Sequence, residues 1–271
     1  MKGIVNLYKP KGWTSRDAVN KVRNILHVKE VGHMGTLDPQ GEGVLPIGIG
    51  KGTRLFDALL KKDKVYEAEF AFGYETPTLD GDSEPSRFAK TIPSQSEIES
   101  KLDEFVGVIR QVPPLYSAKN VNGARAYDLA RKGVDFTLEA AEVEVYSFEL
   151  IKRTAENTYL MRIHCSAGTY IRSLCRDLAY SLDSLATMVS IKRVRAGGFR
   201  IEESVTVEEL RHGLTLAHVL AVHGKKPRTI GARILRRLLI GASPFPRPLP
   251  CPRSVLAIRR ALRHERALSP W

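Results

Sequence analysis

The stretch Gly32-His33-Met34-Gly35-Thr36-Leu37-Asp38-Pro39 decides how the rest of this 271-residue chain is interpreted. It places one carboxylate, that of Asp38, beside a histidine in a loop that contains glycines. Pro39 biases the backbone of Asp38 toward an extended conformation, and the two glycines allow bends that a side chain would obstruct. A carboxylate presented in this way suits a nucleophile or a base. Taken alone, the eight residues favour an ordinary turn, because Asp and Pro are common turn formers.

Composition sets the broad class of the protein. Hydrophobic residues make up 43% of the chain and charged residues 27%, which is typical of a globular domain, and the length suits one large domain with or without a small appendage. The three cysteines, Cys165, Cys175 and Cys251, lie far apart in the sequence. This spacing argues against a zinc site and a disulfide framework. With no apolar run long enough for a signal peptide or a membrane span, the sequence predicts a cytoplasmic protein without a metal.

The net charge of +12 is concentrated at one end of the chain. Residues 221–271 hold twelve Lys and Arg residues and one acidic residue, so the preceding 220 residues are almost neutral. Five prolines alternate with other residues through 244–252, a pattern that disfavours helix and central strand. A basic domain usually indicates a nucleic-acid partner. Here that argument applies to the tail and only weakly to the rest of the chain.

The origin of this tail has several explanations that the sequence leaves open. Residues 230–240 have a basic amphipathic pattern, which suits RNA, a membrane surface or a short docking helix. The abrupt change in composition near residue 224 also fits a shifted reading frame. We therefore predict a catalytic domain over 1–220 and a separate Arg/Pro-rich tail over 221–271, either poorly ordered or out of frame.

Residue patterns predict an α+β fold. We expect helices at 16–26, 97–105, 124–131, 169–182 and 206–211, and strands at 66–72, 142–151 and 158–164. The order of these elements lacks a regular βαβ rhythm. It therefore indicates a mixed, largely antiparallel sheet flanked by helices and loops.

Five motifs, in one order along the chain, resemble the TruB-type tRNA pseudouridine-55 synthases. The loop at 32–39 and its continuation at 43–48 resemble the catalytic motif of that family. The other matching segments are 3–15, 64–66 with 78–82, 113–119 with Gly123 and 127–133, and 165–174. The resemblance covers about residues 3–212 and outweighs the interpretation of 32–39 as an ordinary turn. It implies the pseudouridine synthase fold and the isomerisation of a uridine to pseudouridine.

The resemblance also implies three catalytic residues. Asp38 would be the catalytic carboxylate, although the sequence does not decide whether it attacks the base, attacks the sugar or removes a sugar proton. Arg172 would pair with Asp38 and orient it. Tyr66 would stack on the base and help to move the proton lost from the ring. The alternatives are a surface charge for Arg172 and a sheet-face aromatic for Tyr66.

The expected substrate is tRNA, bound through its T-arm, with the target base flipped out of its loop before reaction. His33 is expected to contact the flipped nucleotide, or alternatively to cap its turn. Leu174 is expected to wall the pocket. Lys9, Lys11, Lys64 and Arg193 are candidates for phosphate contacts, and each of them also fits an ordinary solvated charge.

No cofactor is expected, because an isomerisation has no redox change and the glycine-rich 48–53 segment lacks the spacing of a nucleotide-binding loop. We expect a monomer that requires no protein partner. Two departures from the family pattern stand out: Asn120 replaces the usual Lys, and residues 221–271 lack the strand pattern of the usual PUA-like domain. The alternative functions are a tRNA-binding or tRNA-remodelling protein without catalysis, and a pseudouridine synthase acting on another RNA.

Overall fold

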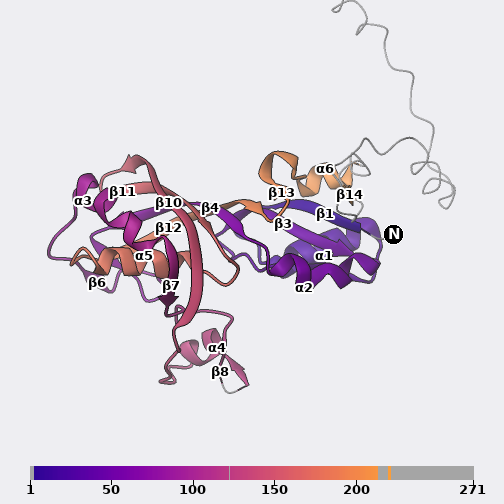
Figure 1. Cartoon of the computed structure of the whole chain (residues 1–271). Coiled ribbons are helices and arrows are strands. Elements are labelled where there is room, and N and C mark those ends of the chain that lie inside the picture. Colours follow the sequence, from indigo (N-terminus) through magenta and orange to yellow (C-terminus); the bar gives the residue numbers. More distant parts are fainter. Residues whose placement is uncertain (1–2, 122, 213–218, 221–271) are drawn as a thin grey trace, which may run out of the picture. The chain divides into compact units, whose positions relative to one another are not determined.

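The computed structural model describes residues 3–121, 123–212 and 219–220 (Figure 1). The chain divides into two units, Met1–Pro227 and Arg228–Trp271, and all described residues belong to the first. The predicted tail at 221–271 lies outside the described residues, so the proposed domain division stays a prediction. None of the described helices has both the length and the apolar character needed to span a membrane.

A ten-stranded sheet forms the framework of the first unit. Its path is β14-β1-β3-β12-β4-β11-β10-β7, with β2 beside β3 and β13 beside β12. Among the described strands only the β3–β12 pairing is parallel, so the predicted mixed, largely antiparallel sheet is confirmed. The strands are β1 (Gly3–Lys9), β2 (Val31–His33), β3 (Glu42–Ile49), β4 (Lys64–Phe72), β7 (Gly107–Gln111), β10 (Ala141–Ala155), β11 (Thr158–Cys165), β12 (Ala186–Ala196), β13 (Phe199–Arg200) and β14 (Val219–Leu220). Two short hairpins lie outside this sheet, β5 (Tyr74–Glu75) with β6 (Arg87–Phe88) and β8 (Asn120–Val121) with β9 (Ala124–Arg125).

Some of the described helices begin where the sequence offers a side-chain cap. Thr14 and Asp17 form a capping box at the start of the first helix, and Thr206 and Glu209 form another before the last described helix. The α-helices are α1 (Ser15–Leu26), α2 (Phe56–Leu60), α3 (Gln95–Lys101), α4 (Ala126–Arg131), α5 (Ile171–Tyr180) and α6 (Val207–Arg211). The 3₁₀ helices are η1 (Gly50–Leu55), η2 (Leu102–Phe105) and η3 (Ile201–Glu203).

All the predicted helices and strands exist, but several bounds differ. The helix predicted over 97–105 begins at Gln95 and continues from Leu102 as a 3₁₀ helix, and two other helices begin later than predicted. The helix predicted from 124 begins at Ala126, because the two preceding residues pair as β9 with β8. The helix predicted from 169 begins at Ile171, because Thr169 closes a turn onto the Ser166 carbonyl and the backbone of Tyr170 bonds to Gln111 instead. Gly133, with φ of +66°, follows α4 as the expected C-terminal glycine.

Two apolar clusters cover the two halves of the sheet. Buried residues of α1 pack on β1 and β3, and α5 and α3 pack on β4, β10 and β11 (Figure 1). The first cluster includes Val5, Ala18, Val22 and Ile47, and the second includes Phe70, Ile98, Met161 and Leu178. Each helix therefore buries one apolar face while its other face meets solvent.

Strand β12 joins the two halves, because it pairs antiparallel with β4 and parallel with β3. At the parallel contact Gly43 lies opposite Arg193. A Cβ atom at Gly43 would lie 2.4 Å from the Arg193 carbonyl oxygen, and the φ angle of Gly43 is +103°. Only glycine meets both conditions, so Gly43 is what lets β3 approach β12 beside the catalytic loop.

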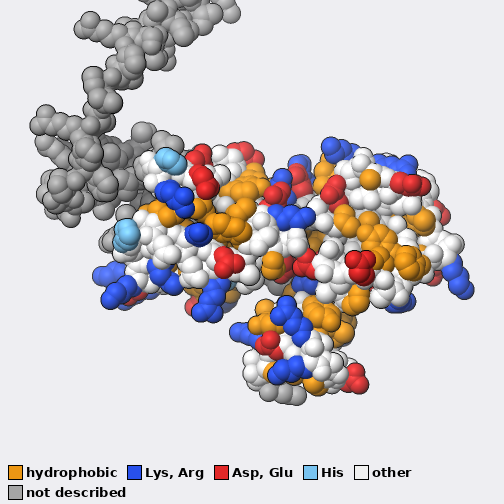
Figure 2. All heavy atoms as spheres, turned by 180° about the vertical axis from the view of Figure 1, so that it is seen from behind, with side chains coloured by type: hydrophobic (Ala, Val, Ile, Leu, Met, Phe, Trp, Pro, Cys, Tyr) orange, Lys and Arg blue, Asp and Glu red, His pale blue; other side chains and the backbone are white. Residues whose placement is uncertain are grey.

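The surface of the described part carries charges of both signs. Figure 2 shows acidic and basic side chains interspersed on one face, with apolar side chains between them. Exposed apolar residues include Val108 on β7 and Tyr146 and Ile151 on β10. This mixed surface agrees with the near-neutral charge of the first 220 residues.

Candidate active site

The loop at 34–41 between β2 and β3 is anchored on both sides of Asp38. Before it, the Ser15 hydroxyl both accepts from the Leu37 amide and donates to the Leu37 carbonyl, each at 2.9 Å. After it, the Pro39 carbonyl accepts from the Gly12 amide at 2.8 Å. Leu37 is itself buried in the apolar cluster under α5. The backbone is therefore fixed while the Asp38 side chain keeps 45% of its surface exposed.

Arg172 pairs with two carboxylates that differ in exposure. Its Nη2 atom lies 3.2 Å from Asp38, and its Nη1 atom lies 3.1 Å from Asp80, whose side chain is only 10% exposed. The same guanidinium donates to the carbonyls of Thr78, at 2.9 Å, and Tyr116, at 3.0 Å. Arg172 thus stays satisfied by buried partners while it orients a carboxylate that substrate can reach.

Burial raises the pKa of Asp80, and the Thr78 hydrogen bond and the charge of Arg172 oppose that rise. The Thr78 hydroxyl donates to one Asp80 oxygen at 2.6 Å, and the Asp82 amide donates to the same oxygen at 3.1 Å. The other oxygen faces Arg172. Both oxygens of this buried carboxyl group are therefore satisfied, as a buried polar group requires.

Gln111 fixes the start of the helix that carries Arg172. It is 1% exposed, and its side-chain amide accepts from the Tyr170 amide at 2.8 Å and donates to the Tyr170 carbonyl at 3.1 Å. The Ser173 hydroxyl donates to the Val112 carbonyl at 2.8 Å. The side chain of Tyr170 does not cap α5. The contacts of Gln111 and Ser173 therefore set the position of the first turn of α5, which contains Arg172.

Tyr66 lies on β4, paired with Ile163 of β11 and Arg193 of β12. It is 9% exposed and packs in the same cluster as Leu37. Burial raises the pKa of its phenol, and the Arg193 guanidinium, which hydrogen-bonds Tyr66, counteracts part of that rise. Asp38 acts on the same phenol through its charge, so the structure brings Asp38, Tyr66 and Arg172 to one site.

His33 is the last residue of β2 and directly precedes the catalytic loop. Its Nδ1 atom is buried and has no hydrogen-bond partner among the described residues. Burial, and then the charge of Arg193, lower the pKa of this imidazole. A neutral ring with one unused nitrogen is suited to bind a polar group that the protein itself does not supply.

Three predicted phosphate contacts are instead buried, with their head groups on backbone carbonyls. Lys9 is 0% exposed, Arg193 1% and Lys64 6%. The carbonyl acceptors are those of Pro10, Trp13 and Pro39 for Lys9, Leu60 and Lys62 for Lys64, and Gly35, Thr36 and Val44 for Arg193. The structure therefore buries these cations, with Lys9 and Arg193 bound to the loop at 34–41 and Lys64 bound to the segment before β4, and does not place them on a surface that a phosphate could reach.

Leu174 and Asn120 were also singled out in the sequence, and the structure places the first in the apolar core and the second in a short hairpin. Leu174 is completely buried in the apolar cluster that also holds Leu37 and Tyr66. Asn120 lies in β8, and its side-chain oxygen accepts from the Gly123 amide at 2.9 Å. Asn120 thus closes its own hairpin turn.

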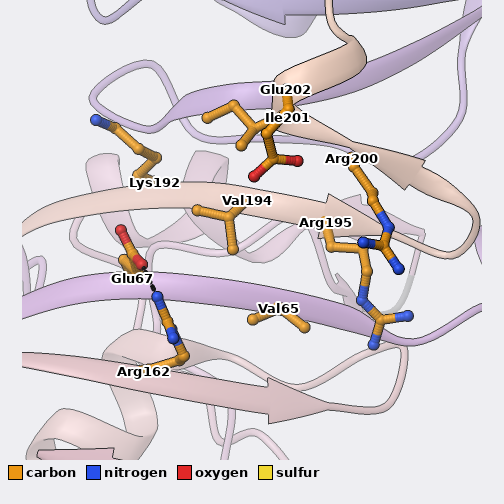
Figure 3. Close-up of a pocket in the computed structure, with 9 residues that line it drawn as sticks. All are labelled: Val65, Glu67, Arg162, Lys192, Val194, Arg195, Arg200, Ile201 and Glu202. Carbon is orange, nitrogen blue, oxygen red and sulfur yellow. Dashed lines mark hydrogen bonds and ion pairs between the residues drawn. The ribbon is translucent and has the colours of Figure 1, made fainter. Parts of the chain in front are cut away.

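A hollow of about 470 Å³ lies on the opposite face of the sheet from Tyr66. Its floor includes Val65 and Glu67, which alternate with Tyr66 along β4 and therefore point the other way. Figure 3 shows the ion pair between Glu67 and Arg162 crossing it, at 2.6 Å. The Lys192 and Arg195 side chains at this hollow are also paired, with Glu42 and Asp63.

Sequence reasoning missed Asp80 and Gln111 as site residues. Asp80 lies in the 78–82 motif, so its position in a matching segment was an available signal. Gln111 gave no local signal, since its partner Tyr170 lies 59 residues further along the chain.

The arrangement of the sheet is shared with solved structures. The chain aligns with a structure titled "Crystal Structure of a Cbf5-Nop10-Gar1 Complex" at a TM-score of 0.61 and 31% identity, covering 78% of this chain and 54% of that one. A structure titled "Structure of H/ACA RNP bound to a substrate RNA containing 2'-deoxyuridine" aligns at 0.58 and 28% identity. This chain spans about half the length of those chains. The fold is that of a pseudouridine synthase.

Sequence comparison defines the family more closely. A model described as "TruB family pseudouridylate synthase (N terminal domain)" matches residues 23–171. A tRNA pseudouridine synthase B of Clostridium perfringens is 42% identical over 224 residues, covering 82% of this chain and 76% of that protein. The tRNA pseudouridine synthase B of Clostridium kluyveri is 37% identical over 248 residues, covering 90% and 85%. The chain belongs to the TruB family of pseudouridylate synthases.

Proposed function

We propose that this enzyme isomerises the T-loop uridine at position 55 of tRNA to pseudouridine, with Asp38 as the catalytic carboxylate. The observation that carries the proposal is the partly exposed Asp38 side chain, held 3.2 Å from an Arg172 that is itself fixed by buried partners. Relatives at about 40% identity bear the name tRNA pseudouridine synthase B, which supports tRNA as the substrate.

The chemistry asked of the site is the movement of one base on one sugar. The bond from ribose C1′ to uracil N1 breaks, the base turns, and C1′ bonds to C5 instead. Asp38 takes part either by attacking the substrate or by removing a proton, and Arg172 holds it in place. Tyr66 supplies the aromatic face on which the base stacks, and its hydroxyl helps to move the C5 proton.

Access to the target requires the base to leave its loop, at a cost of a few kcal/mol that pocket contacts must recover. The buried, unpartnered Nδ1 atom of His33 supports a contact with the flipped nucleotide. Leu174 backs the apolar wall behind Tyr66 and Leu37. The proposal gives Lys9, Lys64 and Arg193 a role in holding the catalytic loop, since their head groups bind its backbone or that of neighbouring segments.

The deciding experiment is a pseudouridine assay on an unmodified tRNA transcript. The control transcript carries cytidine in place of the target uridine. We expect one pseudouridine per tRNA in the first transcript and none in the second. Modification at another position, or only in a different RNA, would support the alternative of a synthase with another substrate.

The Asp38→Asn variant separates catalysis from binding. The amide keeps the shape of the side chain and removes its charge, so turnover should vanish while tRNA affinity stays within a few-fold. Substantial turnover by this variant would contradict the role of Asp38. If the wild-type chain binds tRNA but forms no pseudouridine, a binding or remodelling protein becomes the better explanation.

The proposal includes a monomer that acts in the cytoplasm without a protein partner. Light scattering of the purified chain, alone and with tRNA, tests whether the chain is a monomer.

A further inference from the structure

Three buried cations near the loop at 34–41 form no direct ion pair among the described residues. Lys9, Lys64 and Arg193 are at most 6% exposed, and none of them forms an ion pair with a carboxylate of the described residues. Their donors bind backbone carbonyls, and that of Arg193 also binds the Tyr66 phenol. Carbonyl dipoles replace part of the lost hydration but do not cancel the charge, and an uncompensated buried charge is costly. This excess of positive charge therefore calls for an explanation in the reaction.

Arg193 lies at the centre of this group. Its charge lowers the pKa of both lysines, although burial is the larger cause in each case and brings each value to about 8. Its guanidinium donates to Val44 at 2.8 Å, to Thr36 at 3.1 Å and to Gly35 at 3.2 Å. The two loop carbonyls lie two and three residues before Asp38.

The same positive field reaches the place where the base would sit. The Arg193 guanidinium hydrogen-bonds Tyr66, the residue on which the proposed function stacks the base. It also acts on the His33 imidazole through its charge. Arg193 is also the β12 partner of Tyr66 on β4, so a base held between Tyr66 and Asp38 would lie beside a fixed positive charge that no carboxylate pairs with.

The reaction creates a negative charge at that place. When the N1–C1′ bond breaks, its electron pair goes to uracil N1 and spreads over the O2 and O4 oxygens, so the base becomes an anion. The electron deficiency at C1′ is met by the Asp38 carboxylate or by loss of the C2′ proton. When C5 later bonds to C1′, the Asp38 carboxylate leaves C1′ or the proton returns to C2′, according to which of the two occurred. The C5 proton then leaves and N1 takes up a proton, so no atom is gained or lost.

We propose that the unpaired buried cations, Arg193 foremost, stabilise the uracil anion as it leaves the sugar. Fixed charges in a water-poor site act strongly on charge that develops in the transition state, and they need no reorganisation at that moment. The inference rests on the proposed function, because it assigns the cations to one step of that isomerisation.

Leaving-group chemistry tests this role. Single-turnover cleavage of the N1–C1′ bond is measured on two transcripts, one with uridine and one with 5-fluorouridine at the target position. Fluorine stabilises the anion of the base, so the loss of a positive charge from the protein should slow the fluorinated transcript less than the uridine transcript. We expect Arg193→Gln to slow the uridine transcript by about 100-fold and the fluorinated transcript by at least several-fold less. Arg193→Lys keeps the charge and should lose less than Arg193→Gln on uridine.

Arg195→Gln is the matched control. Arg195 lies on the same strand, but its guanidinium pairs with Asp63 at 2.6 Å and lines the hollow on the other face (Figure 3). Arg195→Gln should therefore show no difference in rate effect between the uridine and the fluorinated transcript. Lys64→Gln provides a second test if Arg193→Gln does not fold, as judged by thermal unfolding, and should show a smaller penalty with the same preference for the fluorinated transcript.

The outcomes separate the inference from the proposed function. Equal penalties on both transcripts, or no penalty for any of these variants, would overturn the electrostatic role and leave only a positioning role. A wild-type chain that forms no pseudouridine would overturn the proposed function and this inference with it. Wild-type activity together with a penalty that shrinks on the fluorinated transcript supports both.

Discussion

Asp80 lies 3.1 Å from the Nη1 atom of Arg172, in a pair in which both side chains are at most 10% exposed. Asp38 uses the other terminal nitrogen, Nη2. Asp38 therefore shares its arginine with a buried anchor, and the position of Arg172 does not depend on Asp38 alone.

The Asp80→Asn variant should bind tRNA normally and react slowly. The amide keeps the volume and one acceptor oxygen but removes the buried charge that holds Arg172. We expect the single-turnover rate to fall about 10- to 100-fold, since small displacements of catalytic groups have effects of this size. The exposed neighbour Asp82 provides the control variant Asp82→Asn. A wild-type rate for Asp80→Asn would mean that the carbonyls of Thr78 and Tyr116 are sufficient to hold the guanidinium.

Replacing Gln111 should loosen the start of α5. Gln111→Met keeps the side-chain volume but loses both hydrogen bonds to Tyr170, leaving buried backbone groups without partners. The free energy of unfolding should fall by about 2–4 kcal/mol, and the rate should fall as well because Arg172 lies two residues after Tyr170. Denaturant unfolding and single-turnover kinetics measure the two effects. Loss of stability with an unchanged rate would show that Arg172 is placed by its own head-group contacts.

The elements that the sequence predicted well carry local signals. The helix α1 has both a capping box and an apolar face, and β4 alternates between buried and half-buried residues over its first six positions. The candidate site residues Asp38, Tyr66 and Arg172 followed from motifs, and the structure brings them together although they come from three separate segments. Their catalytic roles stay predictions.

The central strands β1, β3 and β12 had no such signal. Strand β3 is buried on both faces at seven consecutive residues, so it shows no alternation, and it contains a proline and two glycines. Strand β12 alternates imperfectly because register shifts interrupt it at Met188/Ser190 and Arg193/Arg195. The burial of Lys9, Lys64 and Arg193 was also missed, since a lysine or arginine in a sequence is normally read as solvated.

Gly43→Ala should damage the junction between the halves of the sheet. A Cβ at this position meets the Arg193 carbonyl at 2.4 Å, and the backbone has a positive φ. Gly133→Ala is the matched control, because Gly133 also has a positive φ, of +66°, but its Cβ would have no neighbour within 4 Å. We expect a loss of about 1 kcal/mol for Gly133→Ala from backbone strain and at least about 3 kcal/mol for Gly43→Ala. Equal losses in denaturant unfolding would show that β3 and β12 separate without cost.

The pH dependence of stability should reveal the buried charge of Lys9. Burial lowers the pKa of Lys9 from 10.5 to about 8 in the folded protein. Below pH 8 both the folded and the unfolded chain hold this proton, and the cost of burying the charge is constant. Between pH 8 and 10.5 the unfolded chain keeps the proton and the folded chain releases it, so the contribution of Lys9 to stability rises with pH.

The Lys9→Met variant lacks this contribution, so its free energy of unfolding should rise less steeply with pH than that of the wild type. The difference in slope should approach, but not exceed, about 1.4 kcal/mol per pH unit within that window. Burial gives Lys64 a similar pKa of about 8, so Lys64→Met should reduce the slope by a comparable amount and the double variant by both. Denaturant unfolding at intervals from pH 7 to pH 10.5 measures these slopes. Parallel curves for the wild type and both single variants would mean that the two ammonium groups keep their protons through contacts stronger than those to the loop carbonyls.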